Sequence, residues 1–374
     1  MNILDYLAWR GDLSFSQDGF NHVDNLVLSY LSYIKYDGLV RENEAISIQE
    51  INRVYFIHHS EKDIEHSSSF ISLAPLVLKA CANCNRFKNT KIANYVSKMD
   101  KKQDLQFCGV EFILDNNTSY IAFRGTDDTM VGWKEDFMTS YCLTQAQIEA
   151  VAYLNKYLDT NKRYIVGGHS KGGLLAYYAA SKMAKEQQDV IEHIYSNDGP
   201  GIVDELFDYQ EFSNIKDKYI KIVPEFSIVG QLFNHQNDMI VIKSKAANIM
   251  QHDGMRWQVL GNNFVCCQSL DKTALVVLKI VNEFLSNASD EERKIFTNGI
   301  FNALDGAGVK NTTDFAQGGL TLIIKVIKEL GEVDSSVKQV SNKLLKALSN
   351  EANIQAKGLI GKMNPFKDKK KVAD

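Results

Sequence analysis

The chain has 374 residues, of which 45% are hydrophobic and 24% charged, a composition typical of a globular protein with one large domain plus an appendage, or with two domains. Its formal net charge of −4 gives no electrostatic reason to expect a nucleic-acid partner. Only four prolines and no low-complexity tract argue against long disordered linkers.

The first residues lack the basic segment and long apolar stretch of a signal peptide, and no run of about 18 apolar residues predicts a transmembrane helix. The six cysteines form no disulfide framework, which suits a reducing compartment. Cys81 and Cys84 form a lone C-x-x-C, and we expect small core residues there rather than a metal site. We therefore expect a cytoplasmic protein without metal or cofactor, with export by a signal-independent route left open.

Residues 1–103 are predicted to be mainly helical. Apolar residues recur at helical spacing in residues 24–36, and Ser47, with a glutamate three positions later, forms a capping-box pattern. Residues 70–81 and 90–99 continue the helical pattern. We expect this part to form a helical cover over the rest of the chain.

Between residues 104 and 262 the pattern changes to alternating strands and helices. Two strand-like runs separated by a turn signal predict a β-hairpin, and short apolar strands then alternate with helices. Such alternation is typical of parallel strands joined by crossover helices, so this part is predicted to be an α/β sheet domain. The strands are predicted at residues 105–114, 119–125, 163–168, 191–197, 219–223 and 239–244, and the helices at residues 146–158, 171–186 and 203–212.

After residue 268 the pattern is helical again, and the last 13 residues carry five lysines. We expect a solvated helical appendage here, with contact to a membrane surface or a docked partner as the alternative. The predicted division is a domain over residues 1–268 and a helical C-terminal region over residues 269–374.

Residues Gly168 to Gly172 form the pattern G-x-S-x-G between a predicted strand and a predicted helix. In this context the motif places Ser170 on a sharp strand-to-helix turn, with its hydroxyl exposed at the edge of the sheet. Side chains two positions before and after the serine would clash across the turn, and both positions hold glycine. The helix N-terminus also directs its free N–H groups at the site. We predict that Ser170 is a nucleophile.

A serine hydroxyl needs a neighbouring base to take its proton. Of the histidines after Ser170, His193 lies inside a predicted strand and His235 in a predicted turn. His252 follows the last predicted strand, where this kind of fold places the base. His252 is therefore the predicted base, and His235 is the alternative.

The third member of such a triad is a carboxylate that orients the imidazole. Asp198 directly follows the predicted strand at residues 191–197, at the edge of the sheet where such sites lie, and is the predicted acid. Asp238 and Glu225 are rival candidates. The sequence "NDGPG" is also compatible with a plain turn around Asp198.

Stabilisation of an oxyanion requires preorganised N–H donors. We predict one donor at the backbone of Lys171, directly after the nucleophile, and a second at Thr126, which offers its N–H and its hydroxyl. The alternative is that this loop is structural, with an ion pair between Arg124 and Asp127.

The segments "AFRGT…GWKEDF", "GGHSKGG" and "QHDGMRW" resemble class 3 lipase-like α/β hydrolases. With the opening "DYLAWRGDLSF…DN" and the "DGPG" segment, residues 1–262 resemble a little-characterised bacterial branch of lipase-like domains of unknown function. The resemblance implies an α/β-hydrolase fold, acyl-ester substrates, Ser170 as nucleophile and Thr126 in the oxyanion hole. In class 3 lipases the acid lies in a segment matching "VPEFSIVG", where the expected position here holds Ser227. This departure favours Asp198 as the acid.

The sequence thus predicts an α/β-hydrolase fold with an N-terminal helical cover and a C-terminal helical extension. The predicted function is that of a serine hydrolase of the lipase or phospholipase type, which cleaves carboxylic esters through a Ser-His-Asp triad and an acyl-enzyme. The expected partner is a small-molecule or lipid ester, and the sequence does not predict the oligomeric state. Two alternatives stay open: a catalytically silent scaffold that binds a partner or a membrane, and an exported toxin-like lipase.

Overall fold

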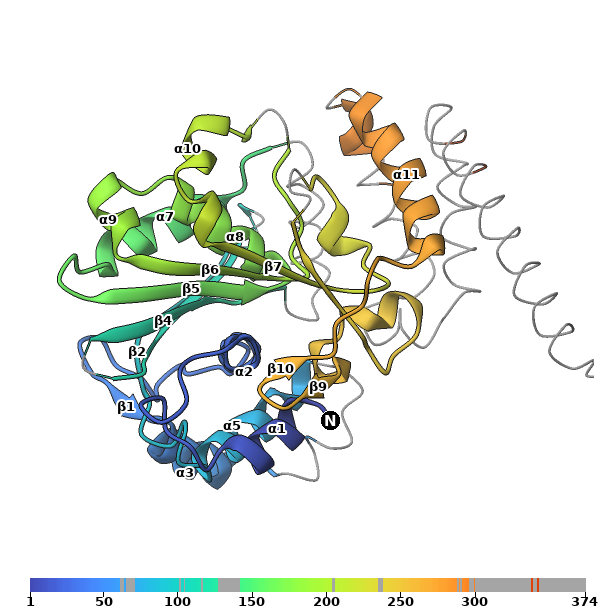
Figure 1. Cartoon of the computed structure of the whole chain (residues 1–374). Helices are drawn as coiled ribbons and strands as arrows, with labels where there is room; N and C mark the ends of the chain where they lie inside the picture. The colour runs from blue at the N-terminus through green and yellow to red at the C-terminus, as the bar shows by residue number, and fades with distance from the viewer. Residues whose placement is uncertain are drawn as a thin grey trace, which may run out of the picture.

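The fold is taken from a computed structural model, which is drawn for the whole chain in Figure 1. The structure describes residues 1–60, 64, 71–100, 102, 103, 105–115, 117–126, 142–203, 206–234, 238–287, 289, 291–295, 299, 338 and 342. Most of the helical region predicted after residue 268 therefore lies outside the described residues, and so does the alternative base His235.

Eight strands of the described chain form one sheet, and their order in space follows their order in the sequence. The strands β1 to β4 are antiparallel neighbours, whereas β4 to β8 run parallel, so the predicted hairpin and the predicted parallel sheet are both confirmed. The strands are β1 (Ile46–Ser47), β2 (Lys91–Asp100), β3 (Leu105–Ile113), β4 (Thr118–Phe123), β5 (Arg163–His169), β6 (Ile191–Asn197), β7 (Tyr219–Pro224) and β8 (Ile240–Ile242), with a separate hairpin of β9 (Val259–Leu260) and β10 (Asn263–Phe264).

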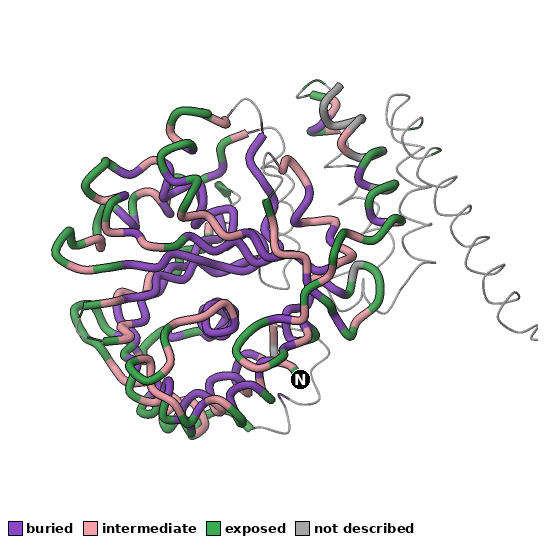
Figure 2. Tube along the Cα trace, viewed as in Figure 1, coloured by how far each residue is buried: buried purple, intermediate pink, exposed green. Residues whose placement is uncertain are grey.

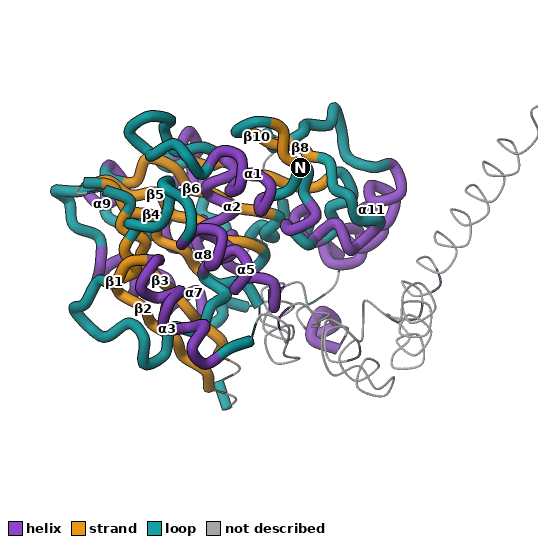
Figure 3. Tube along the Cα trace, turned by 90° about the horizontal axis from the view of Figure 1, so that it is seen from below, coloured by secondary structure: helices purple, strands orange, loops and turns teal. Residues whose placement is uncertain are grey.

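Helices cover both faces of this sheet, which confirms the α/β class (Figure 1). One face carries α7 (Gln145–Tyr157), α8 (Lys171–Ser181), α9 (Lys185–Asp189) and α10 (Tyr209–Ser213), and the other carries α1 (Ile3–Arg10), α2 (His22–Leu31), α3 (Ile48–His58) and α5 (Ala74–Ala82). The second set lies nearest the viewer when the molecule is seen from below (Figure 3). The buried apolar residues form two clusters, one for each helical layer, so the sheet is the middle layer.

Shorter elements connect these layers. The 3-10 turns are η1 (Ile71–Leu73), η3 (Lys216–Lys218), η4 (Val229–Gln231), η5 (Asn248–His252) and η6 (Gly254–Arg256). The amphipathic helix predicted directly after residue 268 is confirmed as α11 (Lys272–Asn287). None of the helices in the described part of the chain has the length and apolarity that a membrane crossing requires.

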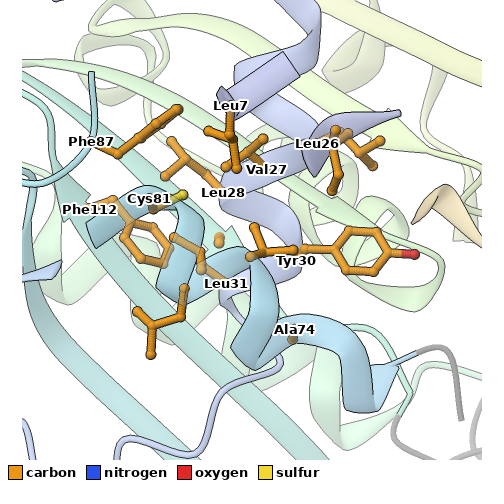
Figure 4. Packing of buried hydrophobic residues seen from close by; sticks show 14 of the residues in the cluster. Leu7, Leu26, Val27, Leu28, Tyr30, Leu31, Ala74, Cys81, Phe87 and Phe112 are labelled. Atoms are coloured by element: carbon orange, nitrogen blue, oxygen red, sulfur yellow. The ribbon is translucent and has the colours of Figure 1, made fainter. Parts of the chain in front are cut away.

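Helix α2 is enclosed by the domain rather than lying over it as an outer cover. Every residue from Val23 to Leu31 is buried, and Figure 2 shows α2 and the central strands as buried segments. Asn21 caps the N-terminus of the helix: its side chain accepts hydrogen bonds from the N–H groups of Val23 and Asp24 in a capping box. Figure 4 shows its leucines packed with Leu7, Phe87 and Phe112. The N-terminal residues therefore supply the core of one whole face of the sheet.

The helix predicted at residues 90–99 was wrong, because this segment is strand β2. It pairs antiparallel with β3, and the register shifts between Ala93 and Val96. Asn94, with a φ of 52°, lies in that shift and breaks the two-residue alternation of a regular strand. Apolar residues on either side of the bulge therefore recur at spacings that resemble a helix.

Arg86 ties the loop that follows α1 to the N-terminal core. Its guanidinium donates to both carboxylate oxygens of Asp24, at 2.7 and 2.5 Å, and both side chains are fully buried. The same guanidinium donates to the backbone carbonyls of Asp18 and Gly19, at 2.8 Å each. Tyr6 also donates its hydroxyl to Asp24, at 2.8 Å. A buried, hydrogen-bonded ion pair therefore fixes the loop between α1 and α2 to the core.

Candidate active site

The G-x-S-x-G motif forms the sharp turn that the sequence predicts. Strand β5 ends at His169, α8 begins at Lys171, and Ser170 between them has φ 57° and ψ −129°, a strained conformation for a residue with a side chain. A Cβ at Gly168 would overlap the Gly172 backbone, so the turn closes only with small residues at these positions. Ser170 is buried except for 8% of its surface.

Asp198 lies at the neighbouring strand end. Strands β5 and β6 run parallel with His169 opposite Asn197, so the residues that follow them, Ser170 and Asp198, leave the sheet side by side. The N–H of Ser170 donates to the carbonyl of Asn197 at 2.9 Å. Asp198 also has a positive φ, 50°, and its N–H donates to the carbonyl of Ile222 at 2.8 Å.

The structure brings His252 onto Asp198. His252 ends the turn η5, which follows β8, and its Nδ1 lies 2.6 Å from Asp198 Oδ2. The Asp198 side chain is 1% exposed, whereas 17% of the His252 side chain stays accessible. This geometry is that of an acid that orients an imidazole, and Ser170, Asp198 and His252 share one edge of the sheet.

His169, the residue before Ser170, joins the elbow to the segment of His252. Its Nε2 lies 2.8 Å from the His252 carbonyl oxygen, and its Nδ1 lies 3.0 Å from the hydroxyl of Tyr33. Burial lowers the pKa of His169 to about 3, so its ring is neutral at ordinary pH. Because a carbonyl can only accept, the proton is on Nε2 and Tyr33 donates to Nδ1. The two imidazole rings lie 4.7 Å apart between centroids.

The predicted oxyanion residues flank the elbow. Gly125 packs against it so closely that a Cβ there would lie 3.3 Å from the Cβ of Ser170, and the buried Thr126 follows directly. Lys171 is the first residue of α8 and directly follows Ser170. Its buried side chain points away to strand β3, where Nζ donates to the carbonyl of Gln106 at 2.9 Å.

Arg124 binds backbone carbonyls of the N-terminal layer. Its guanidinium donates to the carbonyls of Ser32 and Ile34, at 2.6 and 2.8 Å, and so binds the chain just after α2. A cation at the carboxyl end of a helix is favourable. Asp127, its ion-pair partner in the alternative predicted from the sequence, lies outside the described residues.

The described rival residues have other surroundings. Glu225 Oε2 accepts from the Cys267 thiol at 3.4 Å. His193 lies within β6 and is exposed, and Asp238 is exposed just before β8. Of the acid and base candidates that the structure describes, only Asp198 and His252 are joined by a hydrogen bond.

A network of buried polar side chains lies beneath the elbow and was not predicted from the sequence. The buried amide of Asn197 donates to the Gly168 carbonyl at 3.1 Å and accepts from the Asn25 amide at 2.8 Å. Tyr30 donates to Asp253, next to His252, at 3.0 Å. Polar residues on the otherwise apolar helix α2 are the signal that could have revealed this network, because buried polar groups need partners.

A buried lysine lies near the acid. Lys221 on β7 is 1% exposed, and its Nζ donates to Asn234 Oδ1 at 3.0 Å. Burial lowers the pKa of Lys221 to about 7, while the charge of Asp198 acts in the opposite direction. Lys221 therefore contributes part of the electrostatic environment of Asp198.

Neither a metal site nor a redox site is indicated at the C-x-x-C motif. Cys81 and Cys84 belong to the hydrophobic core, and burial raises the pKa of both thiols. Within the described residues, no cluster of three or more His, Cys, Asp or Glu side chains has the arrangement of a metal site.

A small cavity of about 160 Å³ opens beside the loop that follows β4. Its walls are largely polar and come from β2, β3, the chain after α2 and the loop after β4. The lining residues are Lys35, Asp37, Ser97, Lys98, Met99, Gln106, Phe107, Cys108, Arg124 and Gly125. Gly125 lines this cavity and also packs against the elbow, whereas Ser170, Asp198 and His252 are not among the lining residues.

A strained strand–serine–helix turn beside an Asp–His pair, at the carboxyl edge of parallel strands, defines a protein of the α/β-hydrolase fold. Residues 81–302, more than half of the chain, match the family model described as Mbeg1-like. The chain therefore belongs to the Mbeg1-like family.

Solved lipase structures are similar to parts of the chain. Lipase II from Rhizopus niveus is 17% identical over 55% of this chain and 86% of its own, with a TM-score of 0.34. The native Rhizomucor miehei lipase propeptide complex is 19% identical over 60% and 85%, with a TM-score of 0.35. M37 lipase is 18% identical over 55% and 68%, with a TM-score of 0.33. No curated protein sequence matches this chain.

Proposed function

We propose that this protein is a serine hydrolase that cleaves carboxylic esters through an acyl-enzyme on Ser170. The observation that carries the proposal is the strained elbow of Ser170 at the same sheet edge as the Asp198–His252 pair, whose Nδ1–Oδ2 distance is 2.6 Å. Strain at a residue that is held by surrounding structure is a feature of functional sites.

In the proposed mechanism, His252 takes the proton of the Ser170 hydroxyl as the oxygen attacks the ester carbonyl. Asp198 holds the imidazole through Nδ1 and stabilises its cation. The backbone N–H of Lys171 and the N–H and hydroxyl of Thr126 donate to the oxyanion. The alkoxide leaves with the proton from His252, and the acyl group stays on Ser170. Water then attacks the acyl-enzyme, with His252 acting as base again.

The substrates that we favour are lipid or phospholipid esters. The support is the resemblance of the "AFRGT" and "GGHSKGG" segments to class 3 lipases, together with the strained turn at Ser170. A lipid substrate also fits peripheral contact of the C-terminal helices with a membrane, which stays part of the proposal. So does the division into a hydrolase domain over residues 1–268 and a helical region over 269–374.

The proposal is tested by hydrolysis of short- and medium-chain p-nitrophenyl esters. Wild-type protein is compared with Ser170→Ala and with the matched control Ser181→Ala, in which a buried hydroxyl that bonds the Tyr178 carbonyl is removed far from the site. We expect activity in the wild type and the control only. Equal rates in wild type and Ser170→Ala would contradict the proposal. A folded but inactive wild type would favour the alternative of a catalytically silent scaffold.

A further inference from the structure

The segment just after β7 contacts both members of the proposed acid–base pair. Ser227, which is fully buried, donates its hydroxyl to Asp198 Oδ1 at 2.5 Å. The preceding N–H, of Phe226, donates to the side-chain oxygen of Gln251 at 3.0 Å, and Gln251 adjoins His252. Ser227 therefore contacts the side chain of the proposed acid, and the residue before it contacts Gln251, the neighbour of the proposed base.

The carboxylate of Asp198 is divided between two partners. Oδ2 faces His252 and Oδ1 accepts from Ser227, so each oxygen has its own hydrogen bond. Gly230 leaves the space that this arrangement needs, because a Cβ there would overlap Asp198 Oδ1. With its backbone N–H fixed to Ile222, the acid has its position set by the backbone and its plane set by the two side-chain contacts.

We propose that Ser227 is a positioning residue that aligns Asp198 with His252; this inference rests on the proposed function. Without the hydroxyl, Oδ1 is a buried charged oxygen that lacks its donor, and the carboxylate turns away from the plane in which Nδ1 lies. Loss of Ser227 therefore lowers turnover more than substrate binding.

The experiment compares wild type with Ser227→Ala, Ser227→Thr and the control Ser181→Ala on a p-nitrophenyl ester. We expect Ser227→Ala to lower kcat roughly 10- to 100-fold, with KM within about twofold. Ser227→Thr keeps a hydroxyl and is expected to restore most of kcat, and Ser181→Ala is expected to match wild type. A Ser227→Ala variant with unchanged kcat overturns the inference. So does a loss that appears only as lower thermal stability.

A second measurement does not depend on turnover. The His252 Nδ1 proton, held between the ring and Asp198, gives a low-field NMR signal that is assigned by its loss in His252→Gln. We expect the signal in wild type and Ser181→Ala, and its broadening or loss through exchange in Ser227→Ala. An unchanged signal in Ser227→Ala overturns the inference. If wild type hydrolyses no ester, the proposed function fails, and this signal still decides the role of Ser227.

Discussion

Two buried carboxylates of this protein bind a nitrogen base in two different ways. In the N-terminal layer, Asp24 and Arg86 are both fully buried, and Arg86 directs further N–H groups at backbone carbonyls. At the sheet edge, Asp198 is equally buried, but its partner His252 stays 17% exposed. The first pair fastens a loop to the core, whereas the second leaves part of its imidazole accessible at the surface.

The backbone separates the two regions as clearly as the exposure does. Asp24 lies in the regular first turn of α2, where it completes a capping box. Ser170 and Asp198 both have positive φ angles, 57° and 50°, each of which costs of order 1–3 kcal/mol for a residue with a side chain. The comparison teaches that the buried ion pair of the N-terminal layer lies in regular backbone, whereas the proposed nucleophile and acid both lie in strained backbone.

The largest effect is expected from removing the Ser170 hydroxyl. In Ser170→Ala we expect ester hydrolysis to fall by at least about 10⁴-fold, because the nucleophile is lost. The free energy of unfolding should change by less than about 0.5 kcal/mol, since the change removes one atom and leaves the glycines of the elbow in place. Urea unfolding and kcat/KM measured on the same samples check both parts. A loss of unfolding free energy that accompanies the loss of activity would show that Ser170 has a structural role.

The opposite outcome is expected in the N-terminal pair. Arg86→Met leaves the Asp24 carboxylate buried without its cation, and we expect unfolding free energy to fall by about 3–5 kcal/mol. Activity per folded molecule should stay close to wild type. The double variant Asp24→Asn, Arg86→Met is the control, and its cost should be smaller than that of Arg86→Met alone. An unchanged urea midpoint in Arg86→Met would contradict the assignment of this pair to stability.

A third prediction concerns acid stability and His169. Its folded pKa of about 3 lies below the ordinary value of about 6.5 for an unfolded chain. As pH falls, the unfolded state therefore binds a proton before the folded state does. The contribution of His169 to the free energy of unfolding is complete above about pH 6.5 and is lost as pH falls toward 3. We expect His169→Gln to be less stable at pH 7 by about 1–3 kcal/mol, through the lost bond to the His252 carbonyl, but to decline less steeply below pH 6.5. Parallel stability curves for the two proteins would show that His169 is not the titrating group.

The smallest effect is expected at the edge of the buried network. Tyr30→Phe removes a hydroxyl that donates to Asp253 at 3.0 Å and accepts from the Met255 N–H at 3.1 Å. We expect a loss of about 1–2 kcal/mol in unfolding free energy and a change in kcat within about fivefold. Thermal unfolding and ester kinetics measure these values. A loss of activity as large as that of Ser170→Ala would place Tyr30 in the catalytic site itself.

The parts of the fold that could be predicted from sequence are those set by local sterics. The elbow could be predicted because its turn excludes side chains at Gly168 and Gly172, and the spacing is visible in the sequence. The position of Asp198 could be predicted because the carboxyl ends of neighbouring parallel strands meet at one edge. Its contact with His252 then follows from where the chain passes after β8.

The parts that could not be predicted depend on tertiary register. The bulge at Asn94 breaks the strand pattern of β2, and its pairing with β3 is a long-range property. The helical pattern of α2 is visible in the sequence, but the local sequence does not indicate that a polar residue of this helix bonds Asn197 beneath the elbow. Ser227 is likewise an ordinary loop residue in the sequence, and only the fold brings its hydroxyl to Asp198.

Covalent labelling of Ser170 by a fluorophosphonate probe tests the central claim most directly, because the probe reacts with an activated serine and needs no knowledge of the substrate. Peptide mass spectrometry should find the adduct on Ser170 in wild type, at a strongly reduced rate in His252→Gln, and no adduct in Ser170→Ala. A folded wild-type protein that stays unlabelled, or an adduct that persists on another serine in Ser170→Ala, would contradict the account.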